Sequence, residues 1–223
     1  MIRPAGLTPP AALWHVALGG AEAAPPWPKE RDRFVFLALL RRWLPRAGAA
    51  CEGFCLEARG VRLLVASPSA VNLRFVLAQA CCAYSRYWHE WYPPRRRVFR
   101  PPRAVSVPAS MRWDSLAGTE AWPVLAGICE HAWQYRWSSA ASHAGLGISY
   151  LPLAMQEWSE AWNCALWRER LAAWPSDVRA RKQLDSLLRR GVPLRALASP
   201  GAVPPPPPLF RPPAEAARAA AGF

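Results

Sequence analysis

The sequence predicts an α+β fold, in which a ferredoxin-like antiparallel sheet of order β-α-β-β-α-β carries helices on one face and is followed by a helical C-terminal extension. Two observations predict it. Between residues 13 and 107, short apolar runs and amphipathic stretches follow one another in the order strand, helix, strand, strand, helix, strand. Beyond residue 107 come stretches with apolar residues at helical spacing.

The first half of this pattern predicts a strand, a helix and a hairpin. Residues 13–20, LWHVALGG, form a short apolar run that ends in a glycine pair, as a strand does when it leaves the sheet through a turn. Residues 30–44 have apolar side chains at 3.6-residue spacing, and Pro45 ends this helix. Residues 50–56 and 61–66 are strand-like and flank a short polar stretch, which is typical of an antiparallel hairpin.

The second half predicts a long helix and a last strand. Residues 71–91 predict a helix that ends before the pair Pro93 and Pro94, and the run AVSV at residues 104–107 predicts a strand. Helical patterns follow near residues 116–131, 156–174 and 177–190. We therefore divide the chain into a domain over residues 1–147, a helical extension over residues 148–197 and a Pro- and Ala-rich tail over residues 198–223, which we predict to be disordered.

The composition favours a polyanion as partner. The 223 residues carry a formal net charge of +13, which comes almost wholly from arginine because Lys29 and Lys182 are the only lysines. The planar guanidinium suits phosphate, although a GC-rich genome favours arginine as well. The longest apolar runs fall below the ~20 residues that a bilayer requires, and proline interrupts the N-terminus, so we predict a cytoplasmic protein without a membrane segment or signal peptide.

Four segments, in the same order, resemble the REP-associated tyrosine transposases, which are single-tyrosine HUH proteins that act on single-stranded DNA. The opening MIRP and the run ALWHVALGG are similar to the N-terminus and first strand of that family. Residues 83–91, AYSRYWHEW, are similar to its nucleophile helix. Residues 122–147 are similar to its Asn-Pro-Val-x-Ala-Gly and Tyr-x-Trp-Ser-Ser segments, and residues 188–194, LRRGVPL, to the ending of its longer members.

The chain departs from this family at the metal site. In the family, the third strand carries a His-hydrophobic-His motif whose histidines bind a divalent cation such as Mg²⁺ or Mn²⁺. Here Gly60 and Arg62 occupy the two positions. Glycine has no side chain and arginine keeps its proton, so neither residue coordinates a metal. We therefore predict no metal site and no cofactor, and an enzyme that is catalytically degenerate.

The resemblance implies Tyr84 as a vestigial nucleophile, with Tyr87 as second choice; without it, both rings are read as packing residues. Strand alternation predicts that Arg62 faces the helix with Tyr84 and holds a phosphate there. A basic stretch with an aromatic ring follows this helix and is typical of a single-strand phosphate track. The predicted DNA-binding residues are Arg62, Arg95, Arg96, Arg97, Phe99, Arg100 and Arg103.

Three functions stay open at this point. The first is a degenerate transposase-like protein that binds single-stranded or hairpin DNA. The second is an active tyrosine transposase or single-strand endonuclease with substituted metal ligands, for which the first candidates are His89, Glu57 and Glu90.

The third function is a repurposed protein-interaction domain that has lost nucleic-acid binding. Four tryptophans in the extension bear on it, and their helical spacing favours packing between helices over a groove for a partner. These residues are Trp158, Trp162, Trp167 and Trp174. Whether the protein is a monomer or an oligomer does not follow from the sequence.

Overall fold

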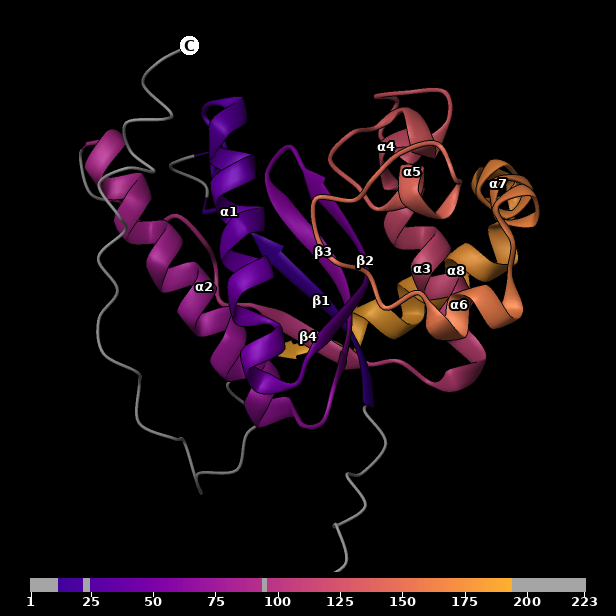
Figure 1. Cartoon of the computed structure of the whole chain (residues 1–223), viewed down its shortest axis with the longest axis horizontal. Helices are drawn as coiled ribbons and strands as arrows, with labels where there is room; N and C mark the ends of the chain where they lie inside the picture. Colours follow the sequence, from indigo (N-terminus) through magenta and orange to yellow (C-terminus); the bar gives the residue numbers. More distant parts are fainter. Residues whose placement is uncertain (1–11, 22–24, 94–95, 194–223) are drawn as a thin grey trace, which may run out of the picture.

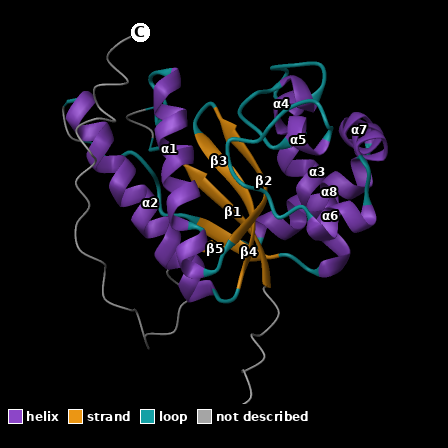
Figure 2. Cartoon of the chain, viewed as in Figure 1, coloured by secondary structure: helices purple, strands orange, loops and turns teal. Residues whose placement is uncertain are grey.

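The computed structural model describes residues 12–21, 25–93 and 96–193 and has a five-stranded antiparallel sheet between two layers of helices (Figures 1 and 2). The strand order is β2-β3-β1-β4-β5. The strands are β1 (Ala12–Gly19), β2 (Ala50–Glu57), β3 (Gly60–Ser67), β4 (Arg103–Ser106) and the short β5 (Val192–Pro193). The predicted α+β class is confirmed, and the first four strands have the ferredoxin-like order.

Helices α1 (Glu30–Trp43) and α2 (Ala70–Trp91) cover one face of the sheet, as the sequence predicted (Figure 1). Every second side chain of the central strands points at them. Val16 from β1 and Val61 and Leu63 from β3 belong to this core. The N-terminus of α2 is capped by Ser69, whose side chain accepts a hydrogen bond from the backbone N–H of Asn72 at 3.1 Å.

The opposite face of the sheet is covered by helices that follow β4. Leu13 and Leu64 point to this side and pack with Leu116 in a second core. The helices of this layer are α3 (Arg112–Glu120), α4 (Trp122–Leu125), α5 (Ala140–His143), α6 (Gln156–Ala161), α7 (Cys164–Ala173) and α8 (Val178–Arg189). The sequence predicted helices in this region but did not predict which surface they cover.

Two of the longer helical patterns are interrupted in the structure. The pattern at residues 116–131 divides into α3 and α4, and Gly127 follows with φ +68°, a backbone conformation that favours glycine. The pattern at residues 156–174 divides into α6 and α7 because the Asn163 side chain caps α7, accepting hydrogen bonds from the N–H groups of Ala165 and Leu166 at 3.0 Å each.

The tryptophans of the extension lie in the second core, which confirms the packing role that their spacing predicted. Trp158, Trp167 and Trp174 are buried, and Trp162 packs against the same cluster. They therefore present no aromatic groove to a partner. Within the described ranges, no helix combines the length and the apolar character needed to cross a bilayer. The predicted disordered tail, residues 198–223, lies outside the described residues.

Candidate functional site

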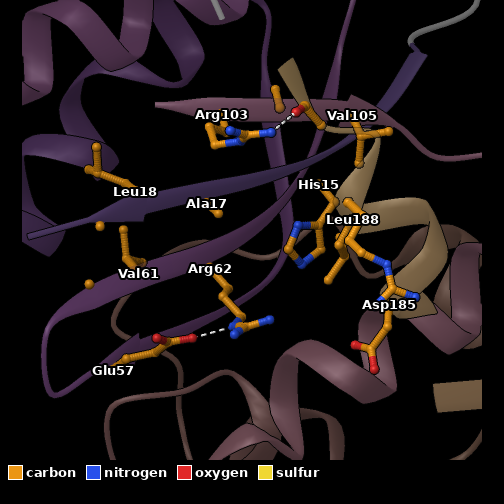
Figure 3. Close-up of a pocket in the computed structure, with 15 residues that line it drawn as sticks. His15, Ala17, Leu18, Glu57, Val61, Arg62, Arg103, Val105, Asp185 and Leu188 are labelled. Atoms are coloured by element: carbon orange, nitrogen blue, oxygen red, sulfur yellow. Dashed lines mark hydrogen bonds and ion pairs between the residues drawn. The ribbon is translucent and has the colours of Figure 1, made fainter. Parts of the chain in front are cut away.

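A cavity of about 530 Å³ lies between the sheet and the C-terminal end of α8 (Figure 3). The register of the central strands sets its floor, because Ala17 of β1 pairs with Arg62 of β3 on one side and with Arg103 of β4 on the other. Paired residues share a face of the sheet, so the two arginines flank the small Ala17 with their Cα atoms about 10 Å apart. Helix α8 adds Asp185, Leu188 and Arg189 to the wall.

Arg62 does not face the helix that carries Tyr84, so the predicted orientation is wrong. Its neighbours Val61 and Leu63 point to α1 and α2, and alternation sends Arg62 to the other face. Helix α2 lies on the face opposite the cavity, and the layer above Arg62 is formed by elements that follow β4 in the chain.

The polar groups of the cavity differ in how they are paired. The Nε–H of Arg62 donates to a carboxylate oxygen of Glu57 at the end of β2, and Arg103 donates to the carbonyl oxygen of Gly191. Arg189 and Asp185 have no hydrogen-bond or ion-pair partner among the described residues, although they are one helical turn apart on α8. The cavity wall therefore combines three arginines with two carboxylates.

His15 is a buried member of the same wall. Burial, helped by the positive charge of Arg62, lowers the pKa of His15 to about 3, so the imidazole is neutral at physiological pH. Its Nε2 atom has no hydrogen-bond partner in the described part of the chain. A neutral imidazole with an unpaired nitrogen offers either one donor or one acceptor, depending on its tautomer.

Tyr84 lies on the far side of the sheet from this cavity. Its side chain is fully buried between α2 and the sheet, with Trp27 and Phe36 against its ring. Its hydroxyl donates a hydrogen bond to the carbonyl oxygen of Pro26, and burial raises the pKa of Tyr84 far above its usual value. A nucleophile must reach its phosphate and lose its proton, and in this structure Tyr84 is placed to do neither.

Tyr87, the second choice, is held in a similar way. Its hydroxyl donates to the buried carboxylate of Asp32 at 2.8 Å. Burial and this hydrogen bond raise the pKa of Tyr87. The structure therefore supports the packing interpretation for both tyrosines.

The basic stretch after α2 runs toward the cavity. Arg95 lies outside the described residues, while Arg96 and Arg97 are exposed. The N–H of Arg100 donates to the carbonyl oxygen of Gly19 at 2.8 Å, at the end of β1 where the cavity begins, and Arg103 already lines the cavity. The stretch thus runs from the end of α2 along the end of the sheet into β4, where the side chain of Arg103 points to the cavity face.

Phe99 is not available as a stacking platform, contrary to the prediction. It forms a β-bridge with Gly20, and the residue is only 7% exposed. Its ring packs 5.8 Å from that of Trp27 and 5.4 Å from that of Phe36, measured between centroids. The backbone pairing with Gly20 directs this ring into the core. The basic residues on either side of Phe99 do not predict this burial.

The alternative metal ligands are not gathered into one site. His89 Nε2 lies 2.7 Å from the carbonyl oxygen of Arg96, whereas Glu57 pairs with Arg62 at the cavity. Across the described ranges, no cluster of three or more His, Cys, Asp or Glu side chains is suited to hold a metal ion. The residues at the positions of the family's histidine pair, Gly60 and Arg62, do not fit a cation either.

Comparisons with known proteins show similarity in structure at low sequence identity. No family model and no curated protein matches the chain. A solved REP-associated tyrosine transposase bound to a REP hairpin is similar over 66% of this chain and 89% of that chain, with a TM-score of 0.49 and 8% identity. A bacterial tRNA(His) guanylyltransferase-like protein in complex with GTP is similar over 51% and 60%, with a TM-score of 0.35 and 15% identity.

Because Tyr84 is a core residue here, Tyr84→Phe tests its role directly. We expect it to lower the free energy of unfolding by about 1 kcal/mol, since the carbonyl of Pro26 loses its buried donor. The affinity for DNA should stay within about twofold, because the ring keeps its packing. Urea denaturation and a DNA-binding titration measure the two effects. A large loss of affinity with unchanged stability would show that the hydroxyl serves DNA.

Proposed function

We propose that this protein binds single-stranded or hairpin DNA at the cavity between the sheet and α8 and does not cleave it. The observation that carries the proposal is that arginines from three separate elements, Arg62 of β3, Arg103 of β4 and Arg189 of α8, line one cavity. Guanidinium groups match phosphate oxygens in bidentate geometry. The three arginines outnumber the two carboxylates of the wall, so the cavity favours an anion. The four collinear segments similar to REP-associated tyrosine transposases favour DNA as that polyanion.

The arginines keep donors for a phosphate although two of them have partners within the protein. A guanidinium carries five N–H donors, and Arg62 uses its Nε–H for Glu57. Arg189 is wholly available among the described residues. The exposed Arg96 and Arg97, and Arg100 beyond them, extend the positive charge from the cavity along the end of the sheet, which suits a strand longer than one nucleotide.

The same residues argue against metal-assisted cleavage. A phosphodiester is cleaved by a tyrosine oxygen when a divalent cation neutralises the scissile oxygens and the tyrosine reaches the phosphorus atom. Arg62 supplies a single charge and no open coordination position. The hydroxyl of Tyr84 is buried on the opposite face of the sheet. Binding and cleavage are therefore expected to be separated in this chain.

Fluorescence anisotropy with a labelled DNA hairpin that carries a single-stranded overhang tests the binding. We expect affinity to fall steeply with salt, because each arginine–phosphate contact releases counterions. A blunt hairpin without the overhang should bind less well. Failure to bind any single-stranded, hairpin or duplex nucleic acid would reject the proposal and favour a protein-interaction domain.

The absence of cleavage is tested in the same preparation. Incubation with the labelled hairpin and Mg²⁺ or Mn²⁺ should give no covalent adduct on a denaturing gel. An adduct that disappears in Tyr84→Phe would establish the alternative, an active enzyme, and would direct the search for metal ligands to His89, Glu57 and Glu90.

A further inference from the structure

The cavity is larger and more apolar than a phosphate site needs. Its volume of about 530 Å³ falls within the ~300–1,000 Å³ range of pockets that enclose small organic ligands. Ala17 and Val105 form the floor on the sheet, and Leu188 stands opposite them on α8 (Figure 3). Apolar walls on both sides suit the faces of a flat ring, while the arginines at the edge suit the phosphates attached to it.

Two polar groups of the wall have no hydrogen-bond partner within the described part of the chain. These are the carboxylate of Asp185, which is exposed at the edge of the cavity, and the Nε2 of His15, which is buried in the wall. Ionised carboxylates only accept hydrogen bonds, so Asp185 selects a ligand edge that presents donors.

Among the four DNA bases, guanine alone has two adjacent donors on its Watson–Crick edge, the N1–H and the 2-amino group. Adenine and cytosine present one amino group next to a ring nitrogen acceptor, and thymine presents one N–H between two carbonyls. An acceptor placed against a carboxylate is repelled. In a single strand or a hairpin loop this edge is unpaired, so the base enters the cavity without the cost of breaking a base pair.

We propose that the cavity encloses one unpaired guanine of the bound strand, with Asp185 accepting hydrogen bonds from its Watson–Crick edge and Arg103 and Arg189 at its phosphates. This inference rests on the proposed DNA binding and adds the base that is read. Leu188 and the floor of Ala17 and Val105 hold the two faces of the ring. The imidazole of His15 forms part of the same wall.

The test compares hairpins whose overhang carries guanine, hypoxanthine, adenine or an abasic site at one position. Hypoxanthine keeps the N1–H but lacks the 2-amino group. We expect the affinity for guanine to exceed that for hypoxanthine by about tenfold, in the range of one well-formed bidentate base contact. The substitution is scanned along the overhang, which also identifies the position that enters the cavity.

Asp185→Asn is the decisive variant, since it keeps the shape of the side chain but removes one acceptor and the charge. We expect the ratio of guanine to hypoxanthine affinity to fall to about one. Affinity for the abasic hairpin should be kept or slightly increased, because a negative charge near the phosphates is removed. The matched control is Glu169→Gln, which removes the same charge from an exposed position on α7 that does not line the cavity.

The outcomes separate this inference from the proposed function. Equal affinity of the wild-type protein for all four overhangs overturns the guanine pocket and leaves DNA binding in place. A guanine preference that survives Asp185→Asn overturns the role of Asp185. Absence of binding to every hairpin overturns both proposals together. A preference that is lost in Asp185→Asn and kept in Glu169→Gln supports the inference.

Discussion

Replacing Arg62, Arg103 and Arg189 together by glutamine is expected to lower the affinity for hairpin DNA by about 100-fold. A 100-fold loss corresponds to about 2.8 kcal/mol, or roughly 1 kcal/mol for each arginine, because 1.4 kcal/mol is a factor of ten in affinity. This is below the ~1.5–3 kcal/mol of a hydrogen bond to a charged group, since glutamine keeps an N–H donor. Three lost phosphate contacts should also flatten the dependence of log affinity on log salt by about two, at ~0.7 per contact for a single strand. Anisotropy titrations at several salt concentrations measure both quantities.

Glutamine is a better replacement than alanine because it keeps an N–H donor on a flexible side chain. In Arg103→Gln this donor is able to form a hydrogen bond to the carbonyl of Gly191, which lies between α8 and β5. The matched control replaces three exposed arginines that do not line the cavity by glutamine, and it lowers the net charge by the same amount. These arginines are Arg41, Arg86 and Arg179. Equal weakening in both triple variants would mean that the net charge of the protein, and not this cavity, attracts DNA.

Replacing Arg96 and Arg97 by glutamine tests whether the bound DNA extends beyond the cavity along the end of the sheet. Both side chains are exposed before the chain crosses the end of β1. We expect a smaller loss than in the cavity variant, because Arg97 already donates its Nε–H to the carbonyl of Phe99 at 2.9 Å. A greater loss here than in the cavity variant would move the main DNA contact to the α2 side of the molecule.

Local patterns in the sequence were sufficient for the strands and helices up to β4. Apolar alternation and turn residues located the hairpin of β2 and β3, and Pro45 located the end of α1. Both signals act within a few residues, so a sequence pattern contains them. The short β5 was not predicted, because two residues that pair with β4 leave no pattern of their own.

The candidate site was only partly predictable, since it depends on contacts between distant segments. Arg62 and Arg103 were named, and the structure brings both to one cavity. Asp185 and Arg189 were missed because nothing in α8 indicates that it lies against strands formed more than 80 residues earlier. The inward ring of Phe99 was missed for the same reason: its bridge to Gly20 is a long-range contact.

The buried carboxylate of Glu120, at the end of α3, forms hydrogen bonds to several segments of the helical layer that follows β4. It has no exposed surface and accepts hydrogen bonds from the hydroxyl of Ser139 and, at 2.9 Å, from the indole N–H of Trp167. The Nδ1 atom of His143 lies 2.6 Å from Oε1 of the same side chain, and a hydrogen bond joins them. Ser139 in turn accepts from the N–H of Phe54 at 2.9 Å, so the network reaches β2.

This network joins the predicted domain, residues 1–147, to the predicted extension, residues 148–197. Glu120 and Ser139 belong to the first and Trp167 to the second. Polar groups in such a network are costly when they lose a partner, because no water replaces it. We therefore expect the two segments to unfold in one cooperative transition, with coincident fluorescence and circular dichroism curves.

Glu120→Ala is expected to lower the free energy of unfolding by about 3–5 kcal/mol. It leaves three buried donors without an acceptor and creates a cavity in place of the side chain. Glu120→Gln should cost less, because the amide still accepts from Trp167 and fills the same volume. The control is Glu130→Ala, whose side chain is 82% exposed and whose loss should change stability by less than ~0.5 kcal/mol. Urea denaturation monitored by tryptophan fluorescence measures all three variants. If Glu120→Ala cost no more than Glu130→Ala, the buried network would contribute nothing to joining the extension to the sheet.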